Sequence, residues 1–253
     1  MSYDKIVDSS ALDASLTAVA DAIREKTGKS ATMTLAEMPT EIGNISDGTD
    51  IIAALLEGTA IDLADDKATS IRAQTFGTTT NGPDYKTSLI HSIKCSNVET
   101  IYIYAFSRCT GLISADFPKC KTVGGSAFYY CSALKSVNLP ELITVGISAL
   151  RNTALESILL PKATTIGNFA FYQNLSLNTV DLGVATSIGA SAFNKCSALF
   201  DLYLRSPTVC SLANTNAFTE TPSSLLIHVP AELVDSYKTA TNWSTYADQI
   251  DAI

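Results

Sequence analysis

Hydrophobic and polar positions recur along this chain with a period of about 22 residues. The segment "TVGGSAFYYCSALKSVNLP", from Thr122 to Pro140, holds glycines, Phe128, Cys131, Leu134 and an alternating Val-x-Leu-Pro ending in that order. Copies of this order align on one apolar residue each, and these residues, called anchors below, are spaced 22, 22, 21 and 22 apart. Such a period predicts a solenoid of stacked coils. The anchors are Phe106, Phe128, Leu150, Phe171 and Phe193.

Each position of the repeat has an expected place in the coil. The segment "SVNL" alternates, so Val137 and Leu139 are expected inside and Ser136 and Asn138 outside a short parallel strand. The anchor, a Cys or Asn three residues later and a Leu six residues later fill one layer of core per coil. A recurrent glycine is expected to permit a tight corner (Gly124, Gly146, Gly167 and Gly189). Strands are predicted around Ile61, Ile93, Ala115, Val137, Ile158, Val180, Leu202 and Ile227.

The segment before the repeats, residues 1–48, is predicted to be helical. Leu12, Leu16, Val19 and Ile23 recur at spacings of 4, 3 and 4, which is typical of an amphipathic helix. This helix is expected either to cap the first core layer or to attach the chain to a partner or a second copy. The spacing covers fewer than two heptads and leaves both interpretations open.

The repeats and the closing segment complete a three-part organisation. Residues 49–230 are predicted to form the solenoid, interrupted by an exposed loop at "GTTTNGPDYKTS". Residues 231–253 are predicted to form a C-terminal cap, because Leu233, Tyr237 and Trp243 suit two small helices lying over the last coil.

Composition and charge exclude several classes of function. The 253 residues are 46% hydrophobic, and the net charge of −8 argues against a nucleic-acid or anionic-membrane partner. The sequence shows neither a signal peptide nor an apolar run long enough to span a membrane. We therefore expect a soluble protein that is not exported by the usual route.

No catalytic, cofactor or metal constellation is expected. The two histidines, His91 and His228, belong to coils far apart in the stack, and the Asp65–Asp66 pair lacks a second acidic group for acid–base work. The six cysteines form no metal-binding spacing. Cys109 and Cys131 fall in adjacent coils, where either a disulfide or two buried thiols is consistent with the spacing.

These repeats resemble those of the BspA-like leucine-rich repeat proteins, over roughly residues 60 to 230. The shared unit IGxxAFxxCxxLxxVxLP is seen in "VGGSAFYYCSALKSVNLP" and "IGASAFNKCSALFDLYL", with mild departures at Leu150, Thr153, Asn174 and Gly183. The resemblance implies a right-handed leucine-rich repeat solenoid of about eight coils with helical caps at both ends. It also implies a non-catalytic binding or adhesion module.

The two ends resemble other segments and suggest two settings. "SLTAVADAIREKTGKSATMTLAEMPTEIGNI" is similar to a segment of phage and prophage tail proteins, and "VDSYKTATNWSTYADQI" to the closing segment of BspA-like proteins. The resemblance implies a virion-associated, receptor-binding protein, found on the particle or in the host cytoplasm before assembly. The alternative is a bacterial cell-surface or host-interaction protein.

The candidate partner-binding residues are those that point outward from successive strands. This column is mixed in polarity, which suits a glycan or a protein on a bacterial surface, although strand positions facing solvent are also polar for solubility alone. Other virion proteins or a second copy are the partners expected for Leu12, Leu16, Val19 and Ile23. Tyr129 and Tyr130, beside Phe128, are further candidates because exposed aromatic residues can contact a partner. The column and one loop residue comprise Lys94, Asp116, Asn138, Leu159, Asp181, Tyr203 and Tyr85.

Overall fold

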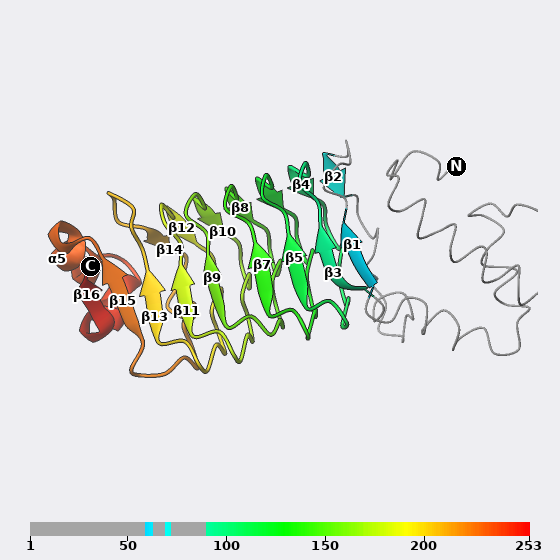
Figure 1. The fold of residues 1–253 in the computed structure, drawn as a ribbon. Helices are drawn as coiled ribbons and strands as arrows, with labels where there is room; N and C mark the ends of the chain where they lie inside the picture. Colours follow the sequence, from blue (N-terminus) through cyan, green and yellow to red (C-terminus); the bar gives the residue numbers. More distant parts are fainter. Residues whose placement is uncertain (1–58, 63–68, 72–89) are drawn as a thin grey trace, which may run out of the picture.

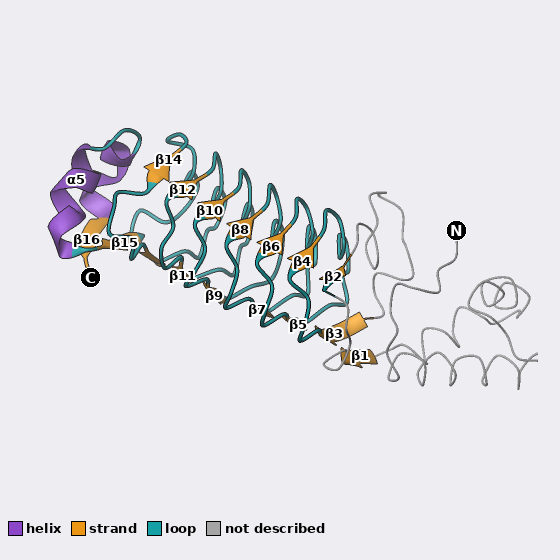
Figure 2. Cartoon of the chain, turned by 90° about the horizontal axis from the view of Figure 1, so that it is seen from above, coloured by secondary structure: helices purple, strands orange, loops and turns teal. Residues whose placement is uncertain are grey.

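The computed structural model describes residues 59–62, 69–71 and 90–253, which form a parallel β-solenoid (Figure 1). Each coil contributes one strand to each of two sides, with loops at the corners between them (Figure 2). The first side, called the strand face, carries β1 (Thr59–Asp62), β3 (Ile90–Lys94), β5 (Ser114–Asp116), β7 (Ser136–Asn138), β9 (Ser157–Leu159), β11 (Thr179–Asp181), β13 (Asp201–Tyr203) and β15 (Leu226–Val229).

The second side, called the short-strand sheet, is one continuous seven-stranded parallel sheet. Its pairs advance by one repeat, as in Thr122 opposite Thr144 and Thr144 opposite Thr165. Its strands are β2 (Ser70–Ile71), β4 (Thr100–Ile101), β6 (Thr122–Val123), β8 (Thr144–Val145), β10 (Thr165–Ile166), β12 (Ser187–Ile188) and β14 (Ser211–Leu212). Together the two sides confirm a parallel solenoid of about seven described coils with a period near 22, and every predicted strand centre falls within a strand.

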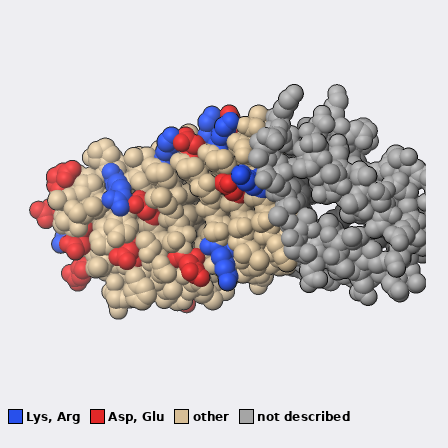
Figure 3. All heavy atoms as spheres, viewed as in Figure 1, with Lys and Arg blue, Asp and Glu red and all other residues tan. Residues whose placement is uncertain are grey.

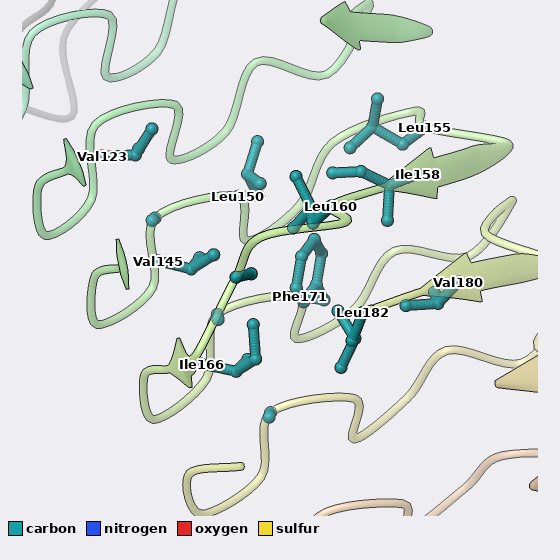
Figure 4. Close-up of a cluster of buried hydrophobic side chains, with 14 of the residues drawn as sticks. Val123, Val145, Leu150, Leu155, Ile158, Leu160, Ile166, Phe171, Val180 and Leu182 are labelled. Carbon is teal, nitrogen blue, oxygen red and sulfur yellow. The ribbon is translucent and has the colours of Figure 1, made fainter. Parts of the chain in front are cut away.

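The core between the two sides is a stack of anchor residues. Phe106 and Phe128 are stacked with ring centroids 4.9 Å apart, and Phe171 and Phe193 are 5.1 Å apart. All four rings are fully buried, as is Leu150, which interrupts the stack between Phe128 and Phe171. Figure 4 shows the aliphatic neighbours of Leu150 and Phe171 converging on the same interior. Burial of these side chains drives the coils together.

The physical role predicted for the recurrent glycines was wrong. None of Gly124, Gly146, Gly167 and Gly189 has a positive φ, so a strained corner does not select glycine there. Instead, a Cβ at these positions would lie 2.5–2.7 Å from an atom of the preceding coil, in every case a backbone atom. Glycine is needed because neighbouring backbones approach closely.

The left-handed backbone conformations are found at other residues. In each of five successive coils the residues two before and two after the anchor have positive φ, as at Ser126 (53°) and Tyr130 (61°). Alternation of left- and right-handed residues turns every second N–H toward the next coil. Phe128 N donates to Ala149 O at 2.8 Å, and Tyr130 N to Arg151 O at 2.9 Å. The corner is therefore held by backbone hydrogen bonds between coils. The sequence did not indicate these conformations, because the residues with positive φ are not glycines.

The C-terminal segment packs over the last coil but is only partly helical. It contains a 3-10 turn (Ala231–Leu233), the short helix α5 (Val234–Thr239), a second 3-10 stretch (Trp243–Gln249) and the strand β16 (Ile250–Ala252). Tyr237 and Trp243 are buried, and both bond to the backbone of Cys210. The prediction of two helices through residue 253 was wrong for β16, which pairs with β15 and extends the strand face.

Several predictions fall outside the described residues. These are the N-terminal helix with Leu12, Leu16, Val19 and Ile23, the boundary at residue 48, and the loop that contains Tyr85. They remain predictions.

Candidate binding site on the strand face

The strand face arranges the predicted column in two blocks. Strand register places Lys94 beside Asp116 and Asp116 beside Asn138. It likewise places Leu159 beside Asp181 and Asp181 beside Tyr203. The column is divided between β7 and β9, which belong to different sheets.

Backbone hydrogen bonds locate this division. At the start of the strands, Lys135 N donates to Ile113 O and Asn178 N to Glu156 O, both at 2.9 Å. The equivalent bond from Glu156 N to Lys135 O is missing from the described chain.

The ends of the strands show the same gap. Phe117 N donates to Asn138 O at 3.0 Å and Leu160 N to Asp181 O at 2.8 Å. The described chain has no corresponding bond from Leu139 N to Leu159 O. The strands β7 and β9 are neighbours without ladder pairing, so backbone donors and acceptors are left unpaired between them.

A shortened repeat accounts for the division. Leu134 follows its anchor Phe128 by six residues, whereas Leu155 follows Leu150 by five. The missing residue lies in the turn that leads into β9, and the short-strand sheet stays paired across the same coil.

Asn174 holds this shortened turn. Its side chain is buried, accepts hydrogen bonds from Thr153 N (2.7 Å) and Thr153 Oγ1 (3.1 Å), and donates to Leu150 O (2.9 Å). In other coils the equivalent residue is a cysteine whose thiol makes one such bond, as Cys196 does to Phe171 O at 3.0 Å.

A groove of about 650 Å³ lies over β3, β5, β7 and β9, across the division. It brings together four of the predicted residues, Lys94, Asp116, Asn138 and Leu159. Asn138 Nδ2 donates to Asp116 Oδ1 at 2.8 Å, and Leu159 is 62% exposed. Hydroxyl groups line the rest of the groove, from Ser92, Ser114, Ser136 and Ser157.

The groove has an apolar floor and mixed charge. Val137, predicted to be inside, is only half-buried here, while its equivalents in the neighbouring strands are buried. Pro140 and Pro161 also line the groove, and Lys135 adds a second cation to the lining in addition to Lys94. Figure 3, which shows this side of the molecule, has charges of both signs scattered over the described part rather than gathered by sign. The volume, the apolar floor and the polar rim suit a small ligand or an extended chain.

The second block of the column is occupied by its own partners. Asp181 accepts from Arg205 Nε at 2.9 Å and from Gly183 N at 3.0 Å. Tyr203 stacks on His228 at 4.4 Å, and His228 Nε2 lies 2.8 Å from Asp201 Oδ1. Asp181 and Tyr203 therefore share the face with the groove but are engaged within the protein. Tyr85 is outside the described residues.

Cysteines and histidines do not assemble into a reactive site in the described structure. The six cysteines, including Cys109 and Cys131, are buried, and none of them forms a disulfide. Burial raises the pKa of the Cys196 thiol to about 12 and that of Cys120 to about 11.

His91 lies in β3 and His228 in β15, so they are separated by six strand steps, roughly 29 Å. No group of three potential metal ligands occurs among the described residues. None of their helices has the length and apolarity to cross a membrane.

Sequence reasoning missed the division and several groove residues. Lys135, Pro140 and Pro161 were not singled out, because each is ordinary within its own repeat. The available signal was the single 21-residue spacing between Leu150 and Phe171, which marked the irregular coil. Arg205 was also missed, since its repeat position is otherwise occupied by proline or Gly183.

Comparison with protein-family models agrees with the observed solenoid fold. A family model described as the BspA type leucine rich repeat region matches six copies, over residues 59–178 and 121–244. Because the match begins at residue 59, it does not bear on the virion-like resemblance of residues 1–48. No curated protein matches the chain.

Solved structures show a related fold. A leucine-rich repeat protein from Bacteroides ovatus is 23% identical with a TM-score of 0.50, over 67% of this chain and 47% of that one. A leucine rich cell surface protein from Faecalibacterium prausnitzii is 22% identical, with a TM-score of 0.41, over 68% and 60%. The pneumococcal vaccine antigen PcpA is 12% identical, with a TM-score of 0.24, over 79% and 90%. The chain thus spans about half the length of the Bacteroides protein.

Proposed function

The chain belongs to the BspA-type leucine-rich repeat family, and we propose that it is a non-catalytic binding module whose ligand occupies the groove on the strand face. Proteins of this architecture present an extended strand surface to their partners. The observation that carries the proposal is the groove over β3 to β9, where charged, hydroxyl and apolar side chains line one space at the division between β7 and β9, which leaves backbone groups without ladder partners. Unpaired donors and acceptors favour a ligand that supplies hydrogen bonds.

The ligand class follows from the lining of the groove. Lys94 and Lys135 form no ion pair with a described residue, while Asp116 and Asn138 are joined to each other. Hydroxyls and an apolar floor at Val137 and Leu159 add hydrogen bonding and packing. A glycan or an extended polypeptide on a cell surface meets these requirements.

Two biological settings remain within this proposal. A role on a bacterial surface is compatible with the family assignment. The virion setting depends on residues 1–48, which lie outside the described residues, and it stays a prediction. If the protein acts on a bacterial surface, we expect it to bind host cells. If it acts on a virion, we expect it to bind bacterial cells.

Fluorescently labelled full-length protein, applied to fixed epithelial cells and to intact bacterial cells, tests the proposal. The test variant is Leu159→Glu, in the groove, and the matched control is Leu226→Glu, on β15 of the same face. We expect wild type to bind one cell type, Leu159→Glu to weaken that binding about tenfold, and Leu226→Glu to bind as wild type. Absence of binding to both cell types, or an equal loss in the two variants, would overturn the proposal.

A further inference from the structure

Cations and tyrosines alternate along a second surface, at the corner that directly follows the anchors. In five successive coils this corner carries a cation, a ring, a cation, a ring and a cation. We call it the tyrosine–arginine edge. It consists of Arg108, Tyr129, Tyr130, Arg151, Tyr172 and Lys195.

The members of this edge are in contact from coil to coil. The guanidinium of Arg151 lies 4.5 Å from the ring centroid of Tyr172 and 5.5 Å from that of Tyr129. Arg108 lies 5.5 Å from Tyr129, and the Lys195 ammonium lies 6.0 Å from Tyr172. These are cation–π distances. Apart from Tyr130, which is 42% exposed, the members are half-buried, so the row is ordered yet accessible.

Backbone bonds fix the spacing of the row. Tyr130 N donates to Arg151 O at 2.9 Å, and Asn152 N to Tyr172 O at 3.0 Å. Neighbouring coils are therefore about 4.8 Å apart, and the backbones of coils that carry successive cations are about 9.6 Å apart. Positive charges therefore recur along the edge at a fixed backbone spacing, and a tyrosine ring lies between successive cations.

The central cation keeps hydrogen-bonding capacity for a ligand. Arg151 pairs with no carboxylate of the described residues, whose ion pairs lie elsewhere, and its Nε donates to Asn152 Oδ1 at 3.2 Å. Its terminal N–H groups suit bidentate binding of a carboxylate or sulfate. Among the described residues, the carboxylate that lies near Lys195 is that of Glu220, at a long distance of 3.7 Å.

We propose that the tyrosine–arginine edge binds a linear polysaccharide in which an acidic sugar alternates with a neutral one. Acidic groups contact Arg108, Arg151 and Lys195 in turn, and the neutral sugars pack against the edges of the Tyr129 and Tyr172 rings that the cations leave uncovered. An extended peptide presents side chains on one face about every 6.6–6.8 Å, which does not match a spacing of about 9.6 Å.

Binding to immobilised hyaluronan and chondroitin sulfate, measured with the full chain at low and high salt, tests the inference. The comparison ligand is hyaluronan with its carboxyl groups reduced, and the comparison macromolecule is poly-glutamate. We expect salt-sensitive binding to at least one acidic polysaccharide and none to the reduced form. Binding to poly-glutamate alone, equal binding to the reduced form, or no polysaccharide binding would overturn the proposal.

Variants locate the site independently of the ligand. Arg151→Gln is expected to weaken polysaccharide binding about three- to tenfold, and Arg151→Lys to recover part of that loss. Lys162→Gln removes the same charge from a different corner, where Lys162 pairs with Glu141 at 2.6 Å, and is expected to bind as wild type. Equal losses in Arg151→Gln and Lys162→Gln would contradict the assignment. Should Arg151→Gln lower the melting temperature, the reduced-polysaccharide comparison on wild type still decides the question.

Discussion

The two sides of the solenoid respond differently to the same missing residue. The short-strand sheet runs unbroken from β2 to β14, whereas the strand face is divided between β7 and β9. In the short-strand sheet, Gly146 and Gly167 let backbones approach so closely that a Cβ at Gly167 would lie 2.7 Å from Gly146 C. On the strand face a close approach of this kind occurs at Gly183, after β11, whose Cβ would overlap Pro161 O, whereas β7 and the turn that follows it contain no glycine. The short-strand sheet therefore keeps the coil spacing across the irregular repeat, and the strand face accommodates that repeat as a groove.

Substitution of Gly167 by alanine is expected to have the largest effect, because its Cβ would meet the backbone of the preceding coil. We expect a loss of about 3 kcal/mol in the free energy of unfolding, measured by urea denaturation. Gly125→Ala is the control, since its Cβ would have no neighbour closer than 3.5 Å. That variant should stay within about 1 kcal/mol of wild type. Equal stability of both variants would contradict the role given to the short-strand sheet.

Asn174→Ala is expected to cause the second-largest loss of stability. The substitution leaves Thr153 N–H and Leu150 C=O buried without their partner, at a cost of about 2 kcal/mol. Cys196→Ala at the equivalent position removes one thiol bond and should cost about 1 kcal/mol. Thermal and urea unfolding compare the two. A smaller loss for Asn174→Ala than for Cys196→Ala would show that Asn174 does not hold the shortened turn.

Restoring the repeat length should remove the division. A serine inserted between Thr153 and Ala154 returns Leu155 to the six-residue spacing found elsewhere. We expect β7 and β9 to pair, with a gain of about 1 kcal/mol from the added backbone bonds and loss of ligand binding in the groove. Stability and cell-binding measurements check both effects. Unchanged cell binding would show that binding does not depend on the division between β7 and β9.

Arg205→Gln should have the smallest effect. Its ion pair with Asp181 is partly exposed, so we expect a loss of about 0.5 kcal/mol. Cell binding should be unchanged, because this pair lies in the block of the strand face outside the groove. A loss of binding would extend the site toward β13.

The repeat made the fold predictable, but not the features that break it. Phe106, Phe128, Phe171 and Phe193 recur at one period, and this alone placed the core layers and strand centres. The left-handed residues were hidden because Ser126 and Tyr130 are not glycines. The strand β16 was hidden because its "IDA" segment follows no repeat.

The sequence predicted which residues of the candidate site point outward from successive strands, but it did not predict the groove. Alternation within each strand put Lys94, Asp116, Asn138 and Leu159 on the outer surface, and the structure gathers them at one groove. The gap between β7 and β9 arises from how two unequal coils stack, which depends on tertiary packing. The internal pairing of Asp181 with Arg205 likewise requires coordinates.

Amide hydrogen exchange at Glu156, followed by NMR, tests the division of the strand face most directly. Lys135, Glu156 and Asn178 occupy equivalent exposed positions, and the amides of Lys135 and Asn178 donate to the preceding coil at 2.9 Å. We expect the Glu156 amide to exchange much faster than the other two, because it lacks that bond. Equal protection of all three amides would show that β7 and β9 are paired and would contradict the account.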